Sequence, residues 1–227
     1  MTKQRIGLIR VLTTADEKLL NLHGELVMQY FPCFDVVSRC IPDQPEGIHD
    51  AETERIAVPK VLALAQEMER EGMDAVIVSC AGDPAVEEAS RSLRIPVIGA
   101  GRAAASAALV TGLPVGVLGI TKVVPEAMSR ILGKNLAADA VPEGVESTLD
   151  LMKPEGMQAL VAAGRFLAGR GARMLVLACT GMSTIGAAGI LRKKTGIPVI
   201  DPVRAQAAAA WTILGMRGGD SRWQKEP

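Results

Sequence analysis

The chain has 227 residues, of which 48% are hydrophobic and 22% are charged, so it holds enough apolar side chains to bury a core. Its 25 basic and 25 acidic residues give a formal net charge of zero, which argues against a nucleic-acid-binding protein or a polybasic membrane protein. Aromatic residues make up 3% of the chain, too few for a base-stacking surface, and no apolar run approaches the roughly 18 residues of a transmembrane helix.

Short apolar segments alternate with helical patterns along the whole chain. Segments rich in Val, Ile and Leu predict buried strands at 5–12, 34–41, 74–79, 95–99, 114–119, 173–178 and 197–201. Helical patterns lie between them at 15–29, 51–71, 84–93, 102–111, 122–132, 154–169, 183–193 and 202–216. This alternation predicts an α/β fold, in which parallel sheets carry helices on both faces and ligands bind at the carboxyl ends of strands.

An internal repeat divides the chain into two similar units. Residues 72–82 and 171–181 both run as Gly, turn, apolar strand, small residue, Cys, small residue and Gly. Each is followed by a helical pattern and then by Ile-Pro-Val-Ile, at 95–98 and at 197–200. All βαβ units resemble one another in their apolar strands, but a shared Cys at the same strand end goes beyond that likeness.

Cys80 and Cys179 each come directly after a predicted strand and just before a predicted helix. Asp83 is expected to cap the first helix, with Pro84 at its first position, and Ser183 to cap the second. A helix N-terminus stabilises a thiolate, so we expect a lowered pKa for at least one of the two thiols. The small residues beside them let backbone N–H groups approach an anionic ligand. These small residues are Ala81, Gly82, Thr180 and Gly181.

The other two cysteines, Cys33 and Cys40, lack such a turn, and we interpret them as packing residues. Four cysteines in a chain that starts without a secretory leader predict free thiols and a cytoplasmic protein. His23 and His49 are not spaced as metal ligands with any Cys, so no metal site is expected.

Two thiols that face each other across one cleft can serve opposite faces of a carbon atom. One thiolate removes a proton and the opposite thiol returns a proton to the other face, which inverts a stereocentre without a cofactor. Backbone N–H groups beside each thiol can hold the oxygen on which negative charge develops.

The motifs Val-Ser-Cys-Ala-Gly-Asp-Pro at 78–84 and Leu-Ala-Cys-Thr-Gly-Met at 177–182 resemble the paired motifs of the aspartate/glutamate/hydantoin racemase superfamily, and most of all its hydantoin racemase branch. The resemblance implies two pseudo-symmetric α/β lobes with the active site between them, residues 1–100 plus 201–227 forming the first lobe and 101–200 the second. It implies general acid/base roles for Cys80 and Cys179, acting on a small amino acid, hydantoin or related acid. We also expect a homo-oligomer.

One segment departs from the hydantoin racemase pattern, which usually has Asn after the first strand. Here the segment reads Arg10-Val-Leu-Thr13-Thr14. Arg10 either pairs with a carboxylate, which favours an open-chain acid over a neutral ring, or is a solvent-exposed residue at a strand end. Thr13 and Thr121 are further candidates for ligand contact, as is Asp83. Residues 41–48, rich in turn formers, form either a lid over the cleft or a plain surface loop.

Three other functions stay open. The same cleft suits a cis–trans isomerase or a decarboxylase of a small diacid, although a decarboxylase needs only one of the two thiols. Residues 99–104 fit the dinucleotide motif G-x-G-x-x-A, but no acidic residue follows at 116–121, where that motif expects one. A non-catalytic protein that binds a small ligand is the third.

Overall fold

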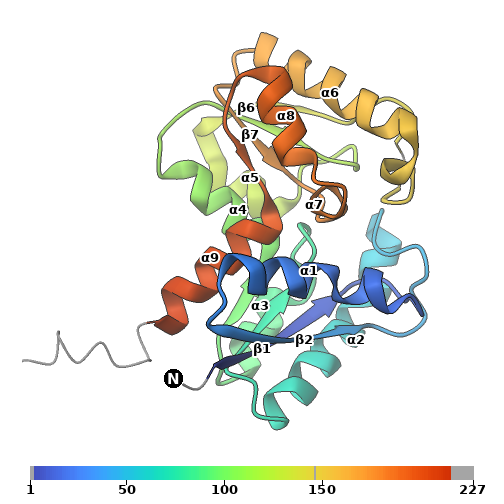
Figure 1. The fold of residues 1–227 in the computed structure, drawn as a ribbon, viewed down its shortest axis with the longest axis vertical. Coiled ribbons are helices and arrows are strands. Elements are labelled where there is room, and N and C mark those ends of the chain that lie inside the picture. Colours follow the sequence, from blue (N-terminus) through green and yellow to red (C-terminus); the bar gives the residue numbers. More distant parts are fainter. Residues whose placement is uncertain (1–2, 146, 216–227) are drawn as a thin grey trace, which may run out of the picture.

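The computed structural model describes residues 3–145 and 147–215, which form an α/β fold with two four-stranded parallel sheets (Figure 1). The strands are β1 (Gln4–Arg10), β2 (Phe34–Cys40), β3 (Ala75–Val78), β4 (Val97–Gly99), β5 (Val115–Leu118), β6 (Leu136–Ala140), β7 (Met174–Leu177) and β8 (Val199–Ile200). The α-helices are α1 (Glu17–Tyr30), α2 (Ala51–Arg70), α3 (Val86–Ser92), α4 (Ala100–Leu109), α5 (Glu126–Leu132), α6 (Pro154–Gly169), α7 (Gly181–Thr184), α8 (Ala187–Thr195) and α9 (Pro202–Gly215).

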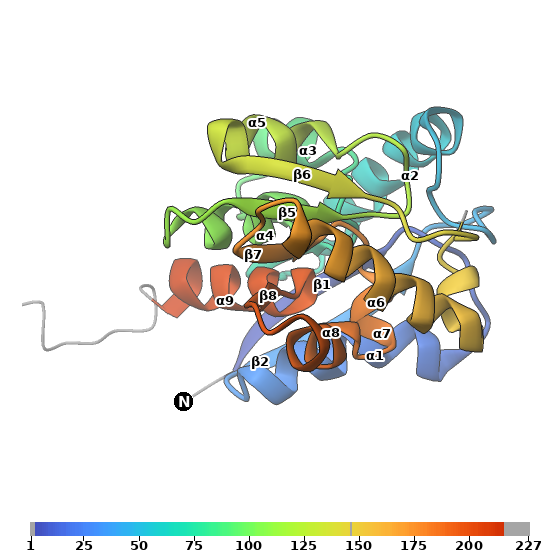
Figure 2. The same ribbon diagram turned by 90° about the horizontal axis from the view of Figure 1, so that it is seen from above.

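The two sheets repeat one topology. The strand order is β2-β1-β3-β4 in the first sheet and β6-β5-β7-β8 in the second, so β5–β8 correspond to β1–β4. Each sheet with its helices forms one lobe, and Figure 2 shows the second lobe from above. The predicted α/β fold with two similar parallel sheets is confirmed. Cys80 and Cys179 each lie two residues beyond the end of equivalent strands, β3 and β7.

The first sheet is covered on both faces because its strands are apolar in both directions. Leu8 and Ile77 pack against α1 and α9 on one face. Ile9 and Val78, their neighbours in sequence, pack against α2 and α3 on the other face. This alternation is the two-residue period of a strand, and burial on both sides explains why the strand segments are continuous apolar runs.

The second sheet is built in the same way. Leu175 and Leu177 pack against α6 and α8, whereas Val115 and Val176 pack against α4 and α5. The continuous apolar cores on both sheets hold the carboxyl ends of β3 and β7 in fixed positions, which is what a site built on strand ends requires.

Helix α9 follows the last strand of the second sheet but packs on the first sheet (Figure 1). Val203, Ala207 and Leu214 lie in one core with Leu8, and the Gln4 side-chain amide donates to the Leu214 carbonyl at 2.8 Å. This packing supports the assignment of residues from 201 onward to the first lobe. The lobe boundaries at 100 and 200 stay a prediction, and residues 216–227 lie outside the described part.

Some elements differ from the sequence prediction. Strand β6 was not predicted, because the sequence Leu-Ala-Ala-Asp-Ala has low strand propensity and the strand lies at a sheet edge. The helix expected from residue 84 begins at Val86, since Asp83 and Ala85 adopt left-handed backbone conformations with φ of 56° and 59°. The helix expected at 183–193 is two helices, separated at Gly186, whose φ is 65°.

No helix within 3–145 or 147–215 combines the length and hydropathy needed to cross a bilayer.

Candidate active site

A cavity of about 1130 Å³ lies between the lobes, at the carboxyl ends of the central strands of both sheets. Every site residue predicted from the sequence lines this cavity, so the fold brings the whole set together. From the first lobe come Arg10, Thr13, Cys80, Ala81, Gly82 and Asp83, and from the second come Thr121, Cys179, Thr180 and Gly181. The functional roles of these residues remain predictions.

Cys80 lies in the turn after β3. It is close enough to Cys179 for the negative charge of one thiolate to affect the other. Burial raises the pKa of the Cys80 thiol to about 12, although the backbone N–H of Gly82 lowers it, and the charges of Asp83 and Glu54 add to the increase. Cys80 is therefore a protonated thiol at neutral pH.

Cys179 has a different environment. Burial also raises its pKa, but four neighbours act in the opposite direction. The Thr148 hydroxyl lies 3.7 Å from the sulfur, the backbone N–H groups of Gly181 and Met182 point to it, and the Arg10 charge is nearby. The pKa of Cys179 stays raised, but Cys179 has more neighbours that stabilise a thiolate than Cys80 has.

The prediction that helix dipoles lower the pKa of at least one of these two thiols is therefore wrong, because the pKa of each is raised. Helix α3 begins at Val86, six residues beyond Cys80, and α7 beside Cys179 is a single turn. The favourable N–H groups are present, but removal of the thiols from water outweighs them.

Asp83 caps a different helix from the predicted one. Its carboxylate accepts from the backbone N–H of Gly101 at 2.8 Å and of Arg102 at 2.7 Å, so it caps α4 rather than α3. Burial raises the pKa of this carboxyl to about 6, against the effect of these two hydrogen bonds. Ser183 does not cap the helix predicted for it either, because it lies within α7 and its hydroxyl donates to Asp201 at 2.9 Å.

The same contact explains the G-x-G-x-x-A motif at 99–104. A Cβ at Gly99 would collide with the Asp83 carboxylate, and one at Gly101 would collide with the Ala81 carbonyl oxygen. The two glycines thus let the Cys80 turn pack against the start of α4. This gives the motif a structural reason that does not involve a nucleotide.

Arg10 is buried, with 4% of its surface exposed, rather than solvent-exposed. Its Nη1 donates to the Leu19 carbonyl at 2.6 Å and to the Leu20 carbonyl at 3.4 Å, which anchors the guanidinium to the first turn of α1. Burial lowers its pKa to about 10, so the group keeps its positive charge at neutral pH.

The three predicted threonines line the cavity, but their hydroxyl hydrogens are used by the protein. Thr13 donates to the Ile41 carbonyl at 2.6 Å, Thr121 to the Val123 carbonyl at 2.8 Å and Thr180 to the Ser79 carbonyl at 3.0 Å. These side chains shape the cavity, and their contact with a ligand stays a prediction.

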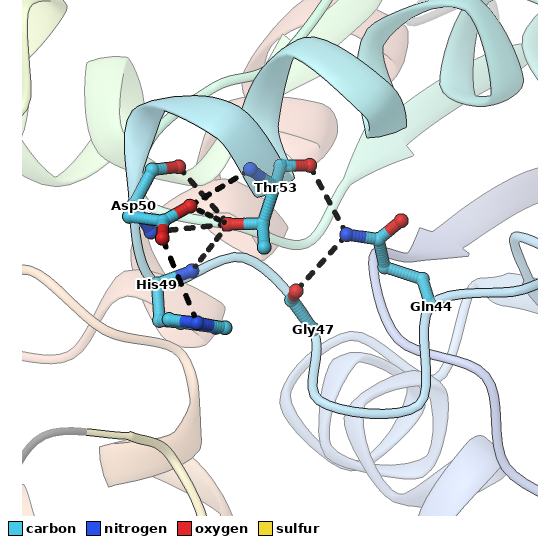
Figure 3. Close-up of polar contacts among 5 residues, drawn as sticks. All are labelled: Gln44, Gly47, His49, Asp50 and Thr53. Carbon is cyan, nitrogen blue, oxygen red and sulfur yellow. Dashed lines mark hydrogen bonds and ion pairs between the residues drawn. The ribbon is translucent and has the colours of Figure 1, made fainter.

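The segment 41–48 forms part of the cavity wall and is held by hydrogen bonds. Figure 3 shows the Gln44 side-chain amide donating to the carbonyls of Gly47 and Thr53, at 3.1 and 3.0 Å. Thr53 and Asp50 form a capping box at the start of α2. His49, the residue before this capping box, lines the cavity. Its Nε2 atom lies 3.8 Å from a carboxylate oxygen of Asp50.

A polar network that sequence reasoning missed lies behind the two thiols. The His23 ring bridges the lobes, with Nδ1 2.9 Å from the Ser79 hydroxyl and Nε2 2.9 Å from the Thr184 hydroxyl. The Gln206 side-chain amide of α9 donates to the Ser79 hydroxyl at 3.1 Å. Ser79 directly precedes Cys80, and Thr184 lies in α7, which begins two residues after Cys179, so the network links the backbone beside one thiol to the helix that follows the other.

Burial and the nearby Arg10 charge hold the pKa of His23 well below its usual value, so the ring is neutral. No sequence pattern points to this residue, because its partners lie 56 and 161 residues away. Thr148 was also missed, because it belongs to a segment without the hydrophobic periodicity of a helix or strand.

Outside the cavity, Cys33 is exposed, so its interpretation as a packing residue is wrong, whereas Cys40 at the end of β2 is partly buried. Among the described residues, no group of three His, Cys, Asp or Glu side chains is arranged to hold a metal ion.

Comparison with known proteins places this geometry in a family. The family model for Asp/Glu/hydantoin racemase matches residues 20–210. Hydantoin racemase of Rhizobium meliloti is 32% identical over 184 residues, which cover 76% of this chain and 73% of that protein. Hydantoin racemase of Pseudomonas sp. (strain NS671) is 28% identical over 190 residues, with coverage of 76% and 71%.

A solved structure, allantoin racemase from Pseudomonas fluorescens, has the same fold. Its TM-score is 0.82 at 23% identity, and the match covers 97% of this chain and 95% of that one. The paired Cys motifs, the repeated sheet topology and the family match agree. The chain therefore belongs to the Asp/Glu/hydantoin racemase family of isomerase enzymes, in its hydantoin racemase-like branch.

Proposed function

We propose that this enzyme inverts a carbon stereocentre by two-base proton transfer between Cys80 and Cys179, without a cofactor. The observation that carries the proposal is that the two thiols, from equivalent strand ends of the two lobes, line one cavity. A substrate carbon between them presents one face to each lobe.

Burial raises the pKa of both thiols, so one of them must lose its proton before it can act as a base. Cys179 has more neighbours that stabilise a thiolate, whereas the negative charges near Cys80 disfavour one, so we assign Cys179 as the base of the first step. The Cys179 thiolate removes the α-proton, and its electron pair stays on the substrate as a carbanion. The Cys80 thiol then donates its proton to the opposite face. The products are the other enantiomer, a Cys179 thiol and a Cys80 thiolate, and the reverse reaction runs the same steps backwards.

Raised thiol pKa values suit this chemistry once the cavity is filled. The α-proton of an amino acid or hydantoin is a weak acid, so a strongly basic thiolate removes it more readily than a weakly basic one. Backbone N–H groups of Gly82, Gly181 and Met182 are available beside the sulfurs to stabilise negative charge.

The substrate is proposed to be a small amino acid, hydantoin or related acid. The curated relatives are hydantoin racemases, and the cavity of about 1130 Å³ is large enough for such a molecule with its side chain. The predicted homo-oligomer stays a prediction.

The test is α-proton exchange in deuterated buffer with the variants Cys80→Ser and Cys179→Ser. Each should lose racemisation by about 10²–10⁴-fold, because a serine hydroxyl is too weak an acid and base at neutral pH. Each should still exchange the α-proton of one enantiomer with solvent, and the two variants should exchange opposite enantiomers.

Cys33→Ser is the matched control, because Cys33 is exposed and does not line the cavity. It should racemise at the parent rate. Exchange of the same enantiomer by both cavity variants, or parent-rate racemisation by either, would refute the two-base reaction. A decarboxylase or a one-nucleophile isomerase would show one inactive variant and no switch of enantiomer.

A further inference from the structure

Arg10 is a buried cation without an acidic partner in the described part of the chain. Its only recorded hydrogen bonds there go to the backbone carbonyls of Leu19 and Leu20, and its Nε is buried with no acceptor. None of the ion pairs among the described residues includes it. The groups whose negative charge would act on Arg10 are the thiols of Cys40 and Cys179, but burial raises the pKa of both and so disfavours their charged forms. Burying a charge without a counter-charge is costly, so we expect a ligand to supply one.

Other cations at the cavity do not share this state. Arg102 lines the same cavity, but its side chain lies 3.9 Å from the Asp83 carboxylate and 3.6 Å from Glu87, and a third of it is exposed. The Arg102 Nε, like that of Arg10, is buried without an acceptor, but its guanidinium has these two carboxylates. Lys122 and Arg130 also line the cavity and are exposed to solvent. Arg10 is therefore the buried cavity cation that has no carboxylate partner among the described residues.

The position of Arg10 also matches the reaction. It is the last residue of β1, the strand next to β3 in the sheet, and it lines the same cavity as both thiols. The α-carbon of an acid is bonded directly to the carboxylate carbon. A carboxylate held at Arg10 thus keeps the α-carbon within the cavity that both thiols line.

We propose that Arg10 binds the carboxylate of the substrate, and that the enzyme therefore acts on an open-chain acid rather than on a neutral hydantoin ring. The inference rests on the proposed racemase function and narrows its substrate class. With a neutral ring in the cavity, only a thiolate of Cys179 or Cys40 would offset the Arg10 charge, and burial disfavours both thiolates. A carboxylate instead forms charge-assisted hydrogen bonds with the guanidinium.

A matched pair of ligands tests this directly. The probes are 5-methylhydantoin and N-carbamoylalanine, its ring-opened form, which shares its carbon and nitrogen skeleton but carries a carboxylate. Isothermal titration of the parent protein at pH 7.5 should show N-carbamoylalanine binding about ten-fold tighter or more.

The variant Arg10→Met should reduce that preference to near parity, while Arg10→Lys, which keeps the charge, should retain part of it. Methionine replaces a buried charge by an apolar chain of similar length, so the variant is expected to fold. Arg102→Met is the control, since it removes a cavity cation that already has acidic partners, and it should keep the parent preference.

The proposal is overturned if the parent binds both probes equally, binds neither, or prefers the hydantoin. It is also overturned if Arg10→Met keeps the preference for the acid. Binding does not require turnover, so these outcomes are distinct from a failure of the two-base reaction. A parent protein that racemises 5-methylhydantoin but not N-carbamoylalanine would leave the racemase proposal intact and remove this one.

Discussion

The buried His23 between the lobes makes the stability of this protein depend on pH in a specific window. Burial and the Arg10 charge lower the pKa of His23 well below its usual value of 6.5, so the folded state binds the imidazole proton poorly. The unfolded chain binds that proton below about pH 6.5. Stability from the neutral ring is therefore complete above that pH and is lost as the pH falls.

The size of the effect follows from the linkage relation. One group contributes at most about 1.4 kcal/mol per pH unit between its unfolded and folded pKa values. From pH 6.5, where the unfolded histidine is half protonated, to pH 5 the parent protein should lose up to about 1.6 kcal/mol of unfolding free energy through His23 alone. Asp83 acts in the opposite direction: burial raises its pKa to about 6, so protonation of that carboxyl stabilises the folded state as the pH falls towards 4.

Comparison with His23→Gln isolates the histidine, because every other group, Asp83 included, is the same in both proteins. Glutamine keeps one donor and one acceptor but does not titrate. At pH 8 the variant should be less stable by about 1–2 kcal/mol, since it cannot match both the Ser79 and Thr184 bonds of 2.9 Å. The difference should shrink by up to about 1.6 kcal/mol between pH 6.5 and pH 5. Urea unfolding followed by circular dichroism at four pH values measures it, and parallel curves for the two proteins would refute a buried neutral His23.

Two further predictions concern the cysteines and the glycine beside one of them. Iodoacetamide should modify exposed Cys33 first and Cys80 last, because burial raises the pKa of the Cys80 thiol to about 12. Mass spectrometry of partly labelled protein gives the order of modification. Early labelling of Cys80 would contradict the prediction. Gly181→Ala should destabilise the fold by about 1–3 kcal/mol and slow racemisation, because the Cβ of the new alanine would collide with the Thr148 methyl group. Thermal unfolding measures the loss of stability, and the exchange assay measures the loss of activity. Gly189→Ala, in α8 with open space around it, should instead be neutral or mildly stabilising.

The repeated parts of the molecule were predictable, because they rest on local patterns. Continuous apolar segments in the sequence predicted that β1, β3, β5 and β7 are buried strands. The ends of β3 and β7 then predicted where the two cysteines lie, two residues further along the chain. The rule that ligands bind at carboxyl ends of parallel strands then located the cavity.

What could not be predicted depends on partners distant in sequence. Asp is a residue type that commonly caps the helix that follows it, but the two N–H groups that donate to Asp83 lie 18 and 19 residues further on, at the start of α4. The burial of Arg10 depends on α1 folding over the end of β1. The predicted direction of the thiol pKa shifts was wrong, because a sequence indicates the nearby N–H groups but not the loss of water around the sulfur.

The return of α9 to the first sheet has a consequence for how the chain emerges from the ribosome. The face of the first sheet that carries Ile6, Leu8 and Ile77 is completed by Val203, Ala207 and Leu214, which are synthesised after the entire second sheet. At a synthesis rate of about 5–20 residues per second, that apolar face waits roughly 10 seconds or longer for its last covering helix. During this interval the first lobe exposes the apolar residues that α9 later covers, and exposed apolar surface of this kind makes a partly folded chain prone to aggregation.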